Sequence, residues 1–208
     1  MGCILSFFLC VVLVQTLTAQ EKKYNQFSVE VNLGGTLPLR PATVDKSEFV
    51  GLPQVGLGAR YMLNRNFGLR GGYGYDRFGD QTAGLSMHRL GLEAVVNLGN
   101  VVGFPHQWRK SIGLLVHSGI GAGTATPLQG GSVEHIGNFL VGLTPQIKLS
   151  NRFSLVGDLS FTTNFKQHYG YNGLSLQAGE SGETGGMLSA SIGIQIYLGK
   201  EYHHADWY

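Results

Sequence analysis

The sequence predicts an all-β fold, an eight-stranded antiparallel up-and-down transmembrane β-barrel. Three observations favour it. The 208 residues include 32 glycines but only 15 basic and 13 acidic residues, roughly twice the usual glycine content and half the usual charge. Hydrophobic residues recur with a period of two in eight segments of membrane-spanning strand length. The N-terminus begins with an uncharged apolar segment typical of export.

Residues 1–19 are predicted to be a signal peptide. They carry no charged side chain, Ile4–Val14 is almost wholly apolar, and cleavage is expected after Ala19. A retained membrane anchor is less favoured, because the apolar stretch is shorter than the roughly 20 residues that span a bilayer. Both cysteines, Cys3 and Cys10, lie in this segment. The remaining chain, with a barrel over 20–199 and a periplasmic tail over 200–208, therefore has no thiol for a disulfide or a metal.

Each predicted strand has one apolar, uncharged face made of alternate residues. In chain order these faces run from Phe27 to Leu33, Val55 to Leu63, Phe67 to Tyr75, Leu90 to Leu98, Ile112 to Ala122, Phe139 to Leu149, Phe153 to Phe161 and Leu188 to Leu198.

Short and long connections alternate along the chain, as an up-and-down barrel requires. Asn64–Asn66 and Ser150–Arg152 are predicted tight turns. Gly99–Lys110 is a long link on the same side as these turns. The links expected to face outward are Pro38–Pro53, Phe78–Gly84, Ala125–Ile136 and Thr163–Gly186.

The opposite faces of the strands carry charges and many glycines. A soluble barrel has the reverse pattern, apolar inside and polar outside, so this alternation favours lipid around the barrel. A soluble β-sandwich with one solvated face per sheet is the alternative. An eight-stranded barrel has an interior just wide enough for side chains to fill, so we expect the charges to pair inside a plugged lumen. The four cations and four anions are Glu30, Arg60, Arg70, Asp76, Arg89, Glu93, Lys148 and Asp158.

Composition and motifs argue against several other functions. The net charge of +2 is too small and too scattered for a nucleic-acid interface. Ser86 and His88 share a strand face, but Glu93, the nearest acid, lies on the other face, so we predict no enzyme and no cofactor. His117 and Ser118 are adjacent and therefore point to opposite faces. His203 and His204, with Asp206, are interpreted as a solvated tail rather than a metal site.

Several runs resemble the N-terminal β-barrel of OmpA-family outer-membrane proteins: GLGARYMLNRNFGL, SIGLLVHSGIG, GNFLVGLTPQIKLSNRFSLVGDLSF and IQIYLGKEYHHADWY. The resemblance covers nearly the whole chain after the signal segment. It implies a barrel in a Gram-negative outer membrane, usually followed by a linker and a periplasmic domain that holds peptidoglycan. Only ten residues follow Leu198. We therefore expect a short form without direct peptidoglycan binding.

Two function classes remain open from the sequence. The favoured one is a structural or interaction protein of the outer membrane, including a role as a subunit of an envelope complex. Its expected partners are outer-membrane lipid and an envelope protein, the latter contacted through the loops or through Trp207 and Tyr208 in the tail. The alternative is a small transport channel.

Overall fold

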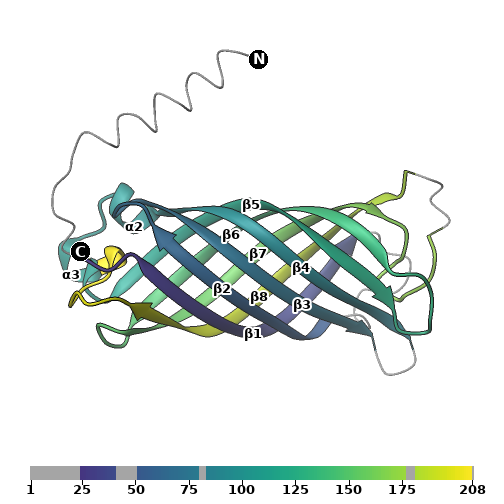
Figure 1. Cartoon of the computed structure of the whole chain (residues 1–208), viewed down its shortest axis with the longest axis horizontal. Coiled ribbons are helices and arrows are strands. Elements are labelled where there is room, and N and C mark those ends of the chain that lie inside the picture. The colour runs from purple at the N-terminus through teal and green to yellow at the C-terminus, as the bar shows by residue number, and fades with distance from the viewer. Residues whose placement is uncertain (1–23, 41–50, 80–82, 177–180, 208) are drawn as a thin grey trace, which may run out of the picture.

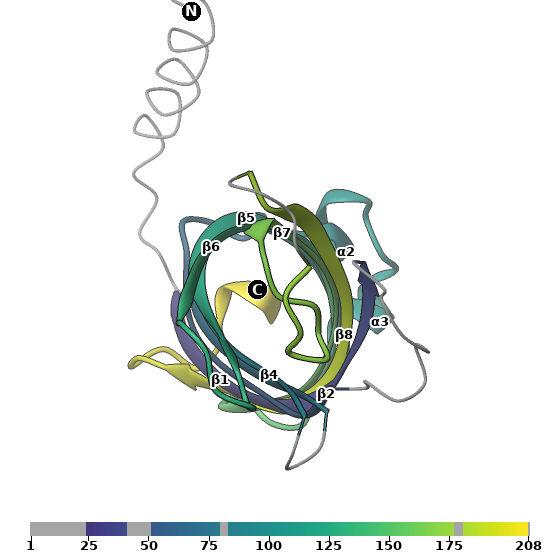
Figure 2. The same cartoon turned by 90° about the vertical axis from the view of Figure 1, so that its right-hand side faces the viewer.

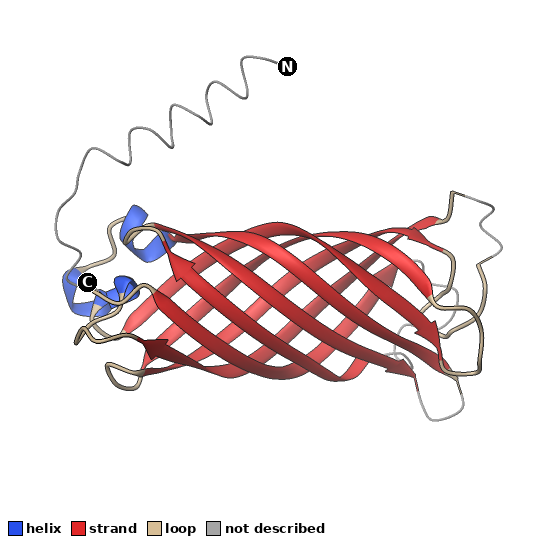
Figure 3. Ribbon diagram, in the orientation of Figure 1, coloured by secondary structure: helices blue, strands red, loops and turns tan. Residues whose placement is uncertain are grey.

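The chain forms a closed antiparallel barrel, so the predicted fold class is confirmed. The computed structural model describes residues 24–40, 51–79, 83–176 and 181–207. The predicted signal peptide lies outside these residues. Each strand pairs with its neighbour in sequence, and β1 pairs with β8 to close the sheet (Figures 1 and 3). The strands are β1 (Phe27–Arg40), β2 (Gly51–Met62), β3 (Phe67–Gly79), β4 (Gly84–Asn97), β5 (Ile112–Pro127), β6 (Glu134–Lys148), β7 (Phe153–Gln167) and β8 (Glu183–Leu198).

Side chains alternate between the outer surface and the lumen along every strand. On β4, Leu92 is 73% exposed on the outer surface, whereas its neighbour Glu93 is 5% exposed and faces the lumen. The same alternation places Ile192 outside and Gln195 inside on β8. This is the pattern that the period of two predicts, because successive strand residues point to opposite faces.

The strands extend further than predicted at the end away from the termini. β1 continues to Arg40, β5 to Pro127 and β7 to Gln167. The backbone ladder continues there, although the apolar face is interrupted: by Gly35 on β1, by Thr124 and Thr126 on β5, and by Thr163 on β7. Prediction from an apolar face therefore ended each strand where that face is first interrupted, rather than where the hydrogen bonding between strands ends.

The end that carries the termini holds the tight turns and the long link between β4 and β5. This link contains two short helices, α2 (Leu98–Val101) and α3 (His106–Arg109). Leu98, predicted as the last outward residue of a strand, instead begins α2. The Asn97 side chain accepts a hydrogen bond from the Asn100 N–H at 3.2 Å, which caps the helix and ends β4.

No helix in the described part of the chain is long and apolar enough to cross a bilayer.

The loop between β7 and β8 folds back across the opposite opening of the barrel (Figure 2). Its Tyr171 is buried, with the ring centroid 4.6 Å from that of Phe78. The Tyr171 hydroxyl donates to the Gly186 carbonyl oxygen at 3.1 Å. This loop completes an apolar cluster at its end of the lumen, which consists of Phe78, Leu85, Met87, Ala125, Ile136, Tyr171 and Met187. The loop end of the lumen therefore contains an apolar cluster, beside buried polar side chains such as Asn164 and Gln167.

Candidate functional site in the barrel lumen

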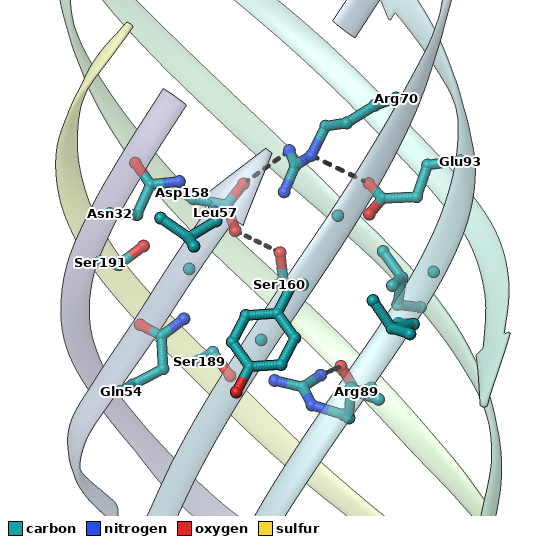
Figure 4. A pocket seen from close by; sticks show the side chains of 18 of the residues that line it. Asn32, Gln54, Leu57, Arg70, Arg89, Glu93, Asp158, Ser160, Ser189 and Ser191 are labelled. Carbon is teal, nitrogen blue, oxygen red and sulfur yellow. Dashed lines mark hydrogen bonds and ion pairs between the residues drawn. The ribbon is translucent and has the colours of Figure 1, made fainter. Parts of the chain in front are cut away.

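The middle of the lumen holds one guanidinium among three carboxylates. Arg70 Nε lies 3.3 Å from Glu30 Oε1 and 3.5 Å from Glu93 Oε2. Its Nη1 lies 3.4 Å from Asp158 Oδ2 (Figure 4). These residues come from β1, β3, β4 and β7, so the cluster spans the lumen and connects opposite walls.

His117 joins this cluster, although it was not among the predicted lumen charges. It is buried, with Nδ1 2.7 Å from Glu93 Oε2 and Nε2 3.1 Å from Asp158 Oδ2. Asp158 also accepts from Thr144 Oγ1 at 3.1 Å and from the Ser160 hydroxyl. A protonated imidazole here would balance a second carboxylate. The sequence already indicated this position, because Val116 and Ser118 are predicted on the outward face and His117, between them, must then point into the lumen.

A second ion pair lies nearer the end of the lumen that the β7–β8 loop crosses. Arg89 Nη2 and Nε donate to Asp76 Oδ2 at 2.6 and 3.1 Å, and Arg89 Nη1 donates to Thr162 Oγ1 at 3.1 Å. Asp76 Oδ1 accepts from Thr36 Oγ1 at 2.5 Å. Asp76 is fully buried, so both of its oxygens are satisfied by protein groups.

A third ion pair joins the barrel to the C-terminal segment, which corrects the prediction of a solvated tail. Arg60 Nη2 lies 2.5 Å from Asp206 Oδ2, and both side chains are buried. Asp206 belongs to the short helix η3 (Ala205–Trp207), which lies inside the barrel end in Figure 2. His204 is 0% exposed, and its ring stacks on that of Tyr197 at 4.4 Å.

Backbone pairing and side-chain bonds hold this segment in place. Asn25 N–H donates to the His203 carbonyl oxygen at 2.8 Å, and Ala205 N–H donates to that of Asn25 at 2.9 Å. Trp207 Nε1 donates to the Tyr197 hydroxyl at 2.9 Å. Tyr208, the other residue proposed for partner contact, lies outside the described residues.

The Arg60 guanidinium controls the ionisation of Asp206. Burial by itself raises the pKa of the Asp206 carboxyl. The charges of Arg60 and His204, with their hydrogen bonds, more than offset this and hold the pKa well below its usual range. Asp206 is therefore a carboxylate at neutral pH.

Lys148 differs from the prediction of a paired lumen charge. It is the last residue of β6, at the rim, and its Nζ lies 5.8 Å from the centroid of the Trp207 ring. It makes no ion pair with any described carboxylate. The expected matching of four cations with four anions is thus wrong in composition, since His117 and Asp206 take part and Lys148 does not.

A row of glycines leaves space for these long side chains. Gly58, Gly72, Gly91 and Gly121 pair in succession across β2 to β5. A Cβ atom at Gly72 would lie 3.4 Å from Glu93 Oε1. Beside the row is a polar cavity of about 70 Å³, lined by Asn32, Gln54 and Ser191 together with the charged residues. That volume suits a few water molecules.

The candidate catalytic and metal residues do not form a site. Ser86 and His88 lie on the outer face of β4, and His88 Nδ1 shares a hydrogen bond with the Tyr73 hydroxyl at 2.7 Å. Glu93 lies across the wall, in the lumen. Ser118 Oγ donates to the Leu140 carbonyl oxygen at 3.1 Å, away from His117. Among the described residues, no group of three or more His, Cys, Asp or Glu could hold a metal ion.

Comparison with known proteins identifies the fold. No family model and no curated protein sequence matches the chain. Neisserial surface protein A is similar in structure with a TM-score of 0.56 and 12% identity, over 83% of this chain and 97% of that chain. The N-terminal β-barrel domain of Pseudomonas aeruginosa OprF has a TM-score of 0.51 and 16% identity, over 84% of this chain and 99% of that chain. The chain therefore has the OmpA-like fold of small eight-stranded outer-membrane barrels.

Proposed function

We propose that this protein is an outer-membrane β-barrel with a closed lumen and a structural or interaction role. One observation carries the proposal: charged side chains cross the lumen between two covered ends. Tyr171 lies at the loop end and Asp206 at the terminal end, with the Arg70 cluster between them. A solute would have to displace all three.

The energetic cost of opening such a lumen is high. Removing one partner of a buried ion pair typically costs about 3 to 5 kcal/mol, because the other charge is left without compensation. Arg60 and Asp206 are such a pair, and Arg89 with Asp76 is another. Steady conduction would require these contacts to be absent for much of the time.

The outer surface supports a location in a membrane. Large apolar side chains such as Leu90, Leu92, Ile120 and Ile192 are exposed around the barrel. A closed barrel leaves no unpaired strand edge, which is the condition for crossing a bilayer with strands. Export through residues 1–19 would place the barrel in the outer membrane, with the termini in the periplasm and the long loops outside.

The interaction role is assigned to the two ends of the barrel. At the loop end, Val133 and Leu174 are exposed apolar residues beyond the strands. At the terminal end, Trp108 is exposed and Trp207 is half-buried. We propose these ends as the contacts for an envelope protein. Direct peptidoglycan binding by 199–207 is not proposed, because His204 and Asp206 are buried within the barrel.

Conductance of the purified full chain in a planar bilayer tests the proposal. The expected result is the absence of steady conductance. The alternative, a small channel, is favoured only by the polar cavity of about 70 Å³. A large, reproducible conductance would overturn the closed lumen. Co-purification of the same envelope protein with the membrane-extracted chain would support the interaction role.

A further inference from the structure

The outer surface of β2 to β5 contains an apolar groove. Its volume is about 710 Å³. Ala59 and Gly71, which are paired across β2 and β3, form the floor because neither has a large side chain. Leu57, Leu92 and Ile120 form the walls. A Cβ atom at Gly71 would contact only Leu92, at 3.9 Å, so the groove has free space above this glycine.

Polar and basic side chains lie at the loop end of the groove. Tyr73, which lines the groove, shares its hydroxyl hydrogen bond with His88 Nδ1. His88 is exposed and stands opposite Tyr75, whose ring centroid is 4.9 Å from that of the imidazole. The next outward pair is Arg77 with Ser86.

The outward direction of Arg77 and Ser86 follows from their neighbours. Asp76 and Phe78 are fully buried in the lumen on either side of Arg77, and Leu85 and Met87 flank Ser86 in the same way. Arg77 makes no ion pair with another residue that the structure describes. Diagonal neighbours across a strand pair are roughly 7 to 8 Å apart, so the long Arg77 side chain and His88 can approach one group from two sides.

Apart from tyrosines, the ionisable groups that point outward on this surface are basic. Within the described residues, no outward position of β3 to β6 carries a carboxylate. Basic or hydrogen-bonding groups continue across the sheet from His88 to Thr124 and then to His135. An apolar groove that ends at such groups is complementary to an acyl chain with a phosphate head.

We propose that this surface binds one molecule of lipid A, the phosphorylated lipid of the outer leaflet. An acyl chain lies in the groove over Gly71, and a phosphate contacts Arg77, His88 and Ser86. A guanidinium forms two parallel hydrogen bonds to phosphate, which favours Arg77 as the main contact. The inference rests on the proposed outer-membrane location, since the loop end must face the leaflet that contains this lipid.

The test is native mass spectrometry of the refolded full chain, titrated with lipid A in phosphatidylcholine. The expected result is retention of one lipid A per barrel. Arg77→Gln with His88→Gln should weaken it at least about tenfold, the scale expected for lost hydrogen bonds to a charged group. Gly71→Leu should weaken it by filling the groove. Lys110→Gln, an exposed cation at the other end, is the matched control and should have no effect.

Further arms separate the possible occupants. Dephosphorylated lipid A should bind the wild-type barrel as weakly as intact lipid A binds the Arg77→Gln, His88→Gln variant. The soluble phosphorylated disaccharide, which has no acyl chains, should compete poorly with lipid A. Equal retention of phosphatidylglycerol would overturn the proposal, as would a dimer of the chain that Gly71→Leu abolishes. A barrel that folds, by its gel shift, but shows no lipid preference would overturn this site alone. Failure to fold in any bilayer would overturn the proposed function and this site with it.

Discussion

Arg60 on β2 lies 2.5 Å from Asp206 in the C-terminal segment, although 146 residues separate them in sequence. Asp206→Asn should leave the Arg60 charge buried and uncompensated, and should lower the free energy of unfolding by about 3 kcal/mol. Urea unfolding of the vesicle-reconstituted barrel measures this. Glu201→Gln, an exposed carboxylate five residues earlier, is the matched control. Equal unfolding midpoints for the two variants would contradict the buried pair.

The same pair predicts how the docking of the C-terminal segment depends on pH. The pKa of Asp206 is lowered in the folded barrel, so its carboxylate contributes stability at neutral pH. This contribution is lost as the pH falls below about 4, the ordinary pKa of an aspartate. Trp207 reports the change once Trp108 is replaced by Phe, since the chain has only these two tryptophans. Asp206→Asn in that background should remove the acid transition, and an unchanged transition would assign it to another group.

Much of the barrel could be predicted because its strands obey one local rule. Alternation along β4 separates Leu92 from Glu93 without any knowledge of neighbouring strands. The ends of the strands could not be predicted from that rule, because the strands remain paired, and pack an apolar cluster inside, beyond the point where the outward apolar face is interrupted. Leu98 was predicted as a strand residue but begins a helix, because Asn97 caps that helix. Capping is a local effect that the alternation of apolar residues cannot indicate.

The pairing within the lumen could not be predicted in the same way. Arg70 meets residues from three other strands, so its partners depend on the shear of the barrel. Arg60 meets Asp206 only because the C-terminal segment folds back, and Tyr171 meets Phe78 only because a loop does. His117 was the exception, because the alternation along β5 alone shows that its side chain points into the lumen. Only its protonation depends on residues of other strands, Glu93 and Asp158.

The two faces of β4 give a prediction about adjacent residues. Leu92→Arg places a charge on the outer surface and should lower the free energy of unfolding in a bilayer by roughly 2 to 4 kcal/mol. Glu93→Gln keeps that surface unchanged and alters only the contacts of Arg70 and His117. Equilibrium unfolding in vesicles compares them, with Leu92→Met as the conservative control. A similar loss in Leu92→Arg and Leu92→Met would argue that the outer surface does not face lipid.

Heat-modifiable migration on SDS gels follows from the closed sheet. Every strand pairs on both sides, so unfolding has no free edge at which to begin. The unheated protein should therefore stay folded in SDS at room temperature and migrate differently from the boiled sample. Circular dichroism of the unheated sample should show β-structure. Identical migration together with a helical spectrum would rule out the barrel.

The loop between β7 and β8 should open when Tyr171 is shortened. Burial raises the pKa of the Tyr171 phenol, so the hydroxyl stays protonated near neutral pH and donates to Gly186. Tyr171→Phe removes that bond, worth about 1 kcal/mol, and the longer one that the hydroxyl accepts from Asn164 Nδ2 at 3.5 Å. Tyr171→Ala also removes the contact with Phe78. Cleavage by trypsin after Lys166, an exposed residue next to the loop, measures opening in intact vesicles. The rate should rise slightly in Tyr171→Phe and strongly in Tyr171→Ala. Tyr202→Ala, at a residue 70% exposed at the other end, should leave the rate unchanged. If Tyr171→Ala also left it unchanged, Tyr171 would not be what holds the loop across the lumen.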